Sequence, residues 1–187
     1  MRNKRIIMPV IQVTLVILTC FLAVACAKPH SASTSSASNP QTADDWYNRG
    51  VFLMAGSKYQ DAIQAYQKYL EFNPKDSEAW KNIGICYAEM GKYTEAVAAY
   101  DKSLQLKPDD PEAWHEKGAA LAAAGKLGEA VVAYAKAVDL YPYEASWWTD
   151  EGDVLTKLGR TAEAQQCYKK ADQREQELDN LDAPLVK

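Results

Sequence analysis

Tryptophan recurs at a strict interval through most of the chain: Trp46, Trp80, Trp114 and Trp148 lie 34 residues apart. Glycine, alanine and tyrosine follow each of them at offsets of four, sixteen and twenty residues, and a proline closes the first three units. Such a period indicates stacked copies of one supersecondary unit, because a single copy cannot bury its apolar face alone. We therefore predict a repeat array. Its columns are Gly50, Gly84, Gly118 and Gly152; Ala62, Ala96, Ala130 and Ala164; Tyr66, Tyr100, Tyr134 and Tyr168; and Pro74, Pro108 and Pro142.

Each unit is long enough for two antiparallel helices joined by short turns. The first, helix A, carries the tryptophan and glycine columns, and the second, helix B, carries the alanine and tyrosine columns. The small residues lie where we expect the two backbones to approach, and the aromatic rings fill the space beside them. Gly91, Gly125 and Gly159 fall at the turn from A to B, where a residue with positive φ ends a helix at low cost, and Ser57 takes that place in the first unit.

These columns resemble the tetratricopeptide repeat family. The resemblance implies an all-α fold, a right-handed α-solenoid of four helix-turn-helix repeats over residues 43–76, 77–110, 111–144 and 145–176. In the fourth unit Asp172 and Arg174 replace the apolar residues that end helix B elsewhere, and no proline follows. We therefore expect no fifth repeat, a polar C-terminal helical extension, and a polar tail over 177–187.

The first 25 residues have the pattern of an export signal or membrane anchor, with three basic residues before an apolar run over 6–25. The end of the run resembles a bacterial-type lipoprotein lipobox, with Ala23 where leucine is usual, and this resemblance implies lipidation of Cys26. An uncleaved anchor and simple secretion stay open, because 20 apolar residues also suffice to span a bilayer. All three readings place the folded part outside the cytoplasm, and the first two anchor it to a membrane of the cell envelope. Residues 26–42 are rich in Ser, Ala and Thr, which is typical of a flexible tether.

Composition and motifs exclude several functions. A net charge of −4 argues against binding nucleic acid. Cys86 and Cys167 share their columns with apolar residues, so we expect core thiols rather than a disulfide or a metal site. His115 is the only histidine of the array; we place it on the exposed side of a helix, with no partner for catalysis. The sequence thus predicts neither an enzyme nor a cofactor.

Protein recognition is the function that remains. In the resembled family, certain places of helix A line a concave groove, and here those places hold seven acids, two lysines and a floor of small apolar residues. This mapping implies a protein or peptide partner with basic and small apolar side chains. A plainer reading stays open, since acids also favour the first turns of helices whatever binds there. The groove candidates are Tyr47, Asn48, Val51, Lys81, Asn82, Ile85, Glu89, His115, Glu116, Ala119, Asp150 and Asp153.

Two further alternatives concern the kind of contact. The chain could be a self-associating structural spacer, a homo-oligomer formed through the apolar groove floor without a peptide ligand. Trp147 belongs to no column and is either an exposed anchor for a partner or, as we favour, packed beside Tyr141 or Tyr143. By resemblance, family members that grip a C-terminal carboxylate of Hsp70 or Hsp90 need basic and amide groups at groove places where this chain has Glu112 and Glu116. We expect no such clamp.

Overall fold

The structure is a computed structural model that describes the backbone of residues 40–182 and the side chains of residues 40–177. The predicted signal or anchor, the lipidation candidate Cys26 and most of the predicted tether lie outside these residues. Residues 40–182 form one compact unit. Within residues 40–182, no helix is both long enough and apolar enough to cross a membrane.

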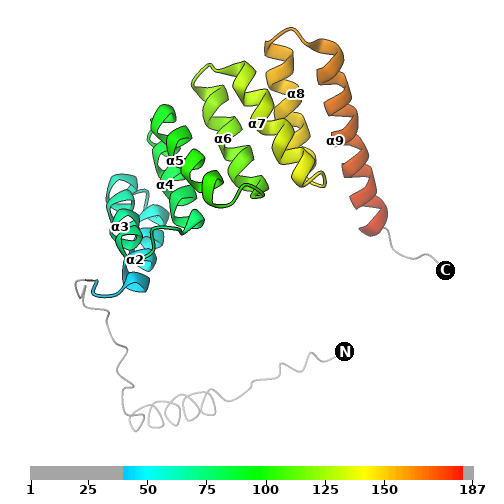
Figure 1. The fold of residues 1–187 in the computed structure, drawn as a ribbon. Helices are drawn as coiled ribbons and strands as arrows, with labels where there is room; N and C mark the ends of the chain where they lie inside the picture. Colours follow the sequence, from blue (N-terminus) through cyan, green and yellow to red (C-terminus); the bar gives the residue numbers. More distant parts are fainter. Residues whose placement is uncertain (1–39, 183–187) are drawn as a thin grey trace, which may run out of the picture. The chain divides into compact units, whose positions relative to one another are not determined.

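Eight helices and no strand make up this part of the chain, which confirms the all-α repeat fold. They form four helix-turn-helix pairs that follow one another along the array, and each helix packs against the next in the chain (Figure 1). The helices are α2 (Ala43–Ala55), α3 (Tyr59–Phe72), α4 (Ser77–Glu89), α5 (Tyr93–Leu106), α6 (Pro111–Ala123), α7 (Leu127–Leu140), α8 (Ala145–Lys157) and α9 (Thr161–Asp182).

The turns inside each pair have the conformation that the sequence predicts. Gly91, Gly125 and Gly159 have φ values of 71°, 78° and 75°, and Ser57 has a φ of 56°. At the first two of the longer connections between pairs, the side chain of an aspartate caps the next helix A. Asp110, for example, accepts a hydrogen bond from the amide of Ala113 at 3.2 Å.

The glycine and tyrosine columns meet inside each pair. An added Cβ on Gly84 would lie 2.5 Å from a ring carbon of Tyr100, which is fully buried, and the other three units repeat this contact. The tyrosine of helix B thus lies against the backbone of helix A, and only glycine leaves room for it. Two tryptophans form hydrogen bonds to the end of the preceding unit. The indole N–H groups of Trp114 and Trp148 donate to the carbonyls of Pro108 and Pro142, at 2.9 and 3.0 Å.

The two ends of the array differ in polarity. Phe52 on α2 is 77% exposed, whereas the residues of the same column in the later units, such as Cys86 and Val154, are buried by the preceding helix B. At the other end α9 continues for 22 residues, eight more than the other B helices, with a polar sequence. Cys86 and Cys167 are free and buried, as expected, and burial raises the pKa of both thiols to about 11.

Candidate partner-binding surface

All twelve groove candidates lie on the A helices, so we call them together the A-helix face. Three come from α2, four from α4, three from α6 and two from α8. Their burial is uneven. Lys81 and Asn82 are buried, Tyr47, Ile85, His115, Glu116, Ala119 and Asp150 are partly buried, and Asn48, Val51, Glu89 and Asp153 are exposed.

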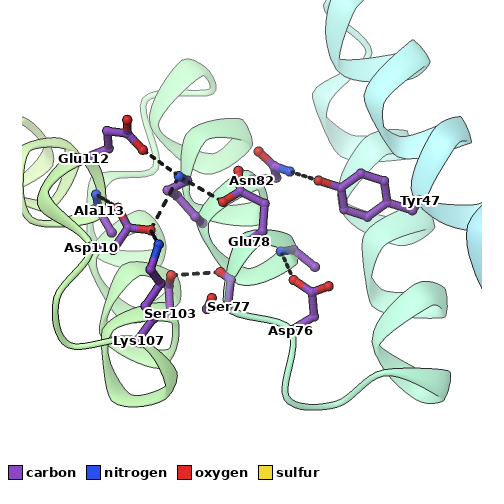
Figure 2. Close-up of polar contacts among 12 residues, drawn as sticks. Tyr47, Asp76, Ser77, Glu78, Asn82, Ser103, Lys107, Asp110, Glu112 and Ala113 are labelled. Atoms are coloured by element: carbon purple, nitrogen blue, oxygen red, sulfur yellow. Dashed lines mark hydrogen bonds and ion pairs between the residues drawn. The ribbon is translucent and has the colours of Figure 1, made fainter.

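Consecutive A helices are joined by hydrogen bonds between residues 35 apart. The amide nitrogen of Asn82 donates to the hydroxyl of Tyr47 at 3.2 Å, from α4 to α2 (Figure 2). His115 Nε2 lies 2.8 Å from a carboxylate oxygen of Asp150, from α6 to α8. The offset exceeds the repeat length by one residue because, in both cases, the fifth residue of one repeat contacts the sixth residue of the next.

Lys81 lies at the centre of the ion pairs on this face. Its Nζ is 3.0 Å from Glu78, 3.2 Å from Glu112 and 3.6 Å from Asp110, and the residue is only 8% exposed. Figure 2 shows these three acids converging from α4 and from the start of α6. Asp110 is buried and also lies 3.6 Å from Lys107. Lys81 therefore neutralises acids of the array itself and is not free to meet an acidic partner.

The placement of His115 differs from our expectation of an exposed side chain. Its ring stacks on Trp147 with 4.9 Å between centroids and also packs against Tyr134 at 5.2 Å. Trp147 in turn packs edge-on against Tyr141, the local contact that we favoured. The period alone gave no sign of the contact between His115 and Trp147, because Trp147 belongs to no column.

Glu116 is a partly buried acid of this face that no basic side chain of the described residues neutralises, whereas the other acids without a basic partner, Glu89 and Asp153, are exposed. Among residues 40–177, no basic side chain lies within 4.0 Å of the Glu116 carboxylate. Burial raises the pKa of the Tyr100 hydroxyl, and the negative charge of Glu116 raises it further. The same two causes act on Tyr134, where Asp150 adds its charge. The middle of the A-helix face is therefore electronegative.

The remaining candidates surround this centre. The carboxylate of Glu89 accepts a hydrogen bond from Tyr59 at 3.3 Å, and that of Asp153 accepts one from Tyr168 at 2.9 Å. Ile85 and Ala119 are partly buried and present apolar surface beside the acids. Where the structure describes the chain, His, Cys, Asp and Glu side chains form no group of three or more suited to a metal ion.

A column of lysines on the B helices was missed by the sequence analysis. Lys102 lies over the Trp80 ring at 4.7 Å and Lys170 over the Trp148 ring at 3.9 Å, each 22 residues after its tryptophan. Lysines also occur at this offset in the other two units, as Lys68 and Lys136. The lysines were visible as a fifth repeated offset, and cation–π contacts account for them in the second and fourth units. In the third unit Lys117 of α6 lies over the Trp114 ring instead, at 5.0 Å.

Comparisons with known proteins agree on the fold. Family models described as tetratricopeptide repeat match residues 43–76, 77–110, 99–132 and 146–177. A comparison with curated proteins finds no significant match.

Solved structures give the same result. A crystal structure of MamA superposes with a TM-score of 0.73 at 20% identity, covering 76% of this chain and 83% of that one. MamA from Desulfovibrio magneticus RS-1 has a TM-score of 0.70 at 23% identity, covering 74% and 78%. The first TPR of Spaghetti (RPAP3), bound to the HSP90 peptide SRMEEVD, has a TM-score of 0.61 at 23% identity, covering 63% and 93%. At these identities the likeness concerns the fold alone.

Proposed function

The chain belongs to the tetratricopeptide repeat family, and from that premise we propose that it is a non-catalytic protein–protein interaction scaffold. Its A-helix face forms a concave groove that binds a segment of a partner protein. The partner segment carries at least one basic side chain among small apolar ones. A nucleic acid is disfavoured as a ligand because the groove and the chain as a whole are acidic.

Glu116 is the observation that carries this proposal. The other central acids have partners within the array, since Glu78 and Glu112 pair with Lys81, and Asp150 pairs with His115. A partly buried carboxylate without a counter-ion is costly and gains most from a cation that a partner brings. Ala119, the next candidate on α6, is a small, partly buried apolar residue, which suits a small apolar side chain of the partner.

The same proposal includes a place in the cell. The N-terminal pattern supports export and attachment to a membrane of the cell envelope, with Cys26 as the lipidated residue and residues 27–42 as the tether. Mass spectrometry of the chain from the membrane fraction tests this part. A diacylated N-terminus at Cys26 is the expected result, and an intact Met1 or an unmodified secreted chain would contradict it.

Charge reversal at Glu116 tests the groove. The full chain and its Glu116→Gln and Glu116→Lys variants are used to capture partners from solubilised envelope. We expect a specific partner to be reduced by Glu116→Gln and lost with Glu116→Lys. Glu95→Lys is the matched control, because Glu95 is exposed on helix B and forms no ion pair among residues 40–177. Capture that is equal for all four proteins would refute the groove.

Self-association is a second candidate function, and Phe52 favours it. This large apolar side chain lies where a preceding helix would pack in any later unit, and it is 77% exposed. A face of this kind can pair with a second copy, so the chain would act as a spacer in an envelope complex. Sedimentation of the wild type and Phe52→Asp distinguishes the cases: a dimer that becomes a monomer supports the spacer, and two monomers exclude it.

A further inference from the structure

A depression at the N-terminal end of the A-helix face combines aromatic walls with acids. It has a volume of about 260 Å³ and is lined by Asp44, Tyr47, Asn48, Tyr69 and Asp76. A second depression of about 420 Å³ shares Tyr69 and Asp76 and adds the exposed Phe72. We propose that this site, called here the unit-1 pocket, binds a cationic side chain of the partner, a lysine or an arginine. The inference deepens the proposed function, on which it rests for the identity of the ligand.

The second repeat shows what this arrangement of acids holds. Its three carboxylates, Glu78, Asp110 and Glu112, surround the ammonium group of Lys81 at 3.0–3.6 Å. Shifted back by one repeat of 34 residues, the same three places hold Asp44, Asp76 and Glu78, and all three are acidic. Two of these acids, Asp44 and Asp76, line the unit-1 pocket, whereas Glu78 pairs with Lys81, so the first repeat keeps two carboxylates of the arrangement.

The central residue is what differs between the two repeats. Tyr47 stands where the second repeat has Lys81, so the first repeat has no lysine of its own there. Among residues 40–177, no basic side chain lies within 4.0 Å of the carboxylates of Asp44 or Asp76. A cation of the ligand would therefore supply the positive charge in the first repeat that Lys81 supplies in the second.

The aromatic residues suit a cation as well. The rings of Tyr47 and Tyr69 meet edge to face with 5.0 Å between centroids, and aromatic faces attract ammonium and guanidinium groups. Tyr69 is specific to this unit, because its column continues as Ser103, Ala137 and Ala171. Its hydroxyl donates a 2.6 Å hydrogen bond to Asp76, which holds that carboxylate at the pocket wall.

The electrostatics agree with this assignment. The hydrogen bond to Asp76 raises the pKa of Tyr69 to about 12, and the charge of Asp44 contributes to the increase. Burial raises the pKa of Tyr47, and the charges of Glu78 and Asp76 raise it further. Tyr47 on α2 and Tyr69 on α3 thus both lie in a negative electrostatic potential, which favours a positively charged ligand.

The pocket is continuous with the proposed groove because Tyr47 and Asn48 belong to both. This continuity favours the side chain of a bound protein segment over a separate small ligand. The segment would place one cation against Glu116 in the middle of the face and another in the unit-1 pocket.

NMR titration of the full-length chain in detergent micelles tests the proposal. The probe is Nα-acetyl-lysine amide, and Nα-acetyl-norleucine amide is its uncharged analogue of similar shape. We expect only the lysine derivative to shift the amide signals of the lining residues. Asp44→Asn should weaken its binding about threefold, the effect of one exposed ion pair. Tyr47→Lys should abolish binding, because it supplies the cation from within.

Asp61→Asn is the matched control, since it removes one exposed acid of the same unit outside the pocket and should leave binding unchanged. No shift at the lining residues, or equal binding to the wild type and Asp44→Asn, would overturn the proposal. Tighter binding of choline than of the lysine derivative would point to a lipid headgroup and overturn the assignment to a partner side chain. If the titration fails in this way while partner capture still depends on Glu116, the pocket alone has failed and the proposed groove stands.

Discussion

Substitution of Gly84 by alanine should destabilise the array, although alanine is the better helix former. The added Cβ would lie 2.5, 2.7 and 2.9 Å from three ring carbons of Tyr100. Ordinary carbon–carbon contacts are about 3.5–4.0 Å, so the ring or the helix must move by about 1 Å. Tyr100 is fully buried among residues of α4, α5 and α6, so its ring cannot shift without displacing neighbouring side chains.

The size of the effect follows from two opposing contributions. Overpacking of a core by one carbon costs about 1–3 kcal/mol, and the change from glycine to alanine in a helix contributes up to about 1 kcal/mol in the other direction. The overlap with a rigid ring favours the upper part of the first range. We therefore expect the free energy of unfolding to fall by about 2 kcal/mol.

Urea denaturation followed by circular dichroism measures this change. Gly128→Ala is the matched control, because Gly128 is also helical and an added Cβ there meets nothing within 4 Å. It should raise the stability by about 0.5 kcal/mol through helix propensity. A Gly84→Ala variant as stable as the wild type would refute the explanation of the glycine and tyrosine columns.

Three further predictions concern charge. Lys81→Met should lower the free energy of unfolding by about 2 kcal/mol in urea denaturation, because it leaves the buried carboxylate of Asp110 with only the exposed Lys107, also at 3.6 Å, as a cationic partner. Burial raises the pKa of Glu151, so ionisation of this residue lowers the free energy of unfolding as the pH rises above about 4.3, the ordinary pKa of glutamate. The Glu151→Gln variant should therefore unfold at a higher urea concentration than the wild type at pH 8, and it should show no such gain at pH 4. The peptide SRMEEVD, to which the first TPR of Spaghetti is bound, should show no binding by calorimetry at millimolar concentration, since its acids would meet Glu112 and Glu116.

The repeat fold could be predicted from the sequence because one interval carried several independent columns. Gly84 and Tyr100, sixteen residues apart, belong to different helices, yet both follow the period. This regularity arises because helix A and helix B pack against each other in the same way in every unit. The positive-φ turn at Gly91 was predictable for the same reason.

The candidate surface could be predicted only in part. The columns placed its residues on one helix of each unit, but they could not show which charges pair between units. Lys81 reads as a free groove lysine in the sequence and is buried among three acids in the structure. That pairing depends on how consecutive A helices are offset, a property of their packing geometry that the period does not encode.

Trp147 is a residue whose contacts the repeat pattern does not encode. It lies outside every column, so the repeat pattern could not assign it a contact, and its stacking on His115 follows only from the approach of α6 and α8. Residues that break a repeat are therefore the ones for which the structure adds most. Tyr47 and Tyr69, also specific to one unit, are further examples.

Site-specific photocrosslinking in the intact cell envelope tests whether partners bind on the A-helix face. A photoreactive residue is placed at Ala119 on this face or at Val132, which is 68% exposed on helix α7. We expect Ala119 to crosslink to a defined segment of another protein, Glu116→Lys to abolish this crosslink, and Val132 to give none to the same segment. Crosslinks to that segment from Val132 alone, or only to further copies of this chain, would contradict partner binding on this face.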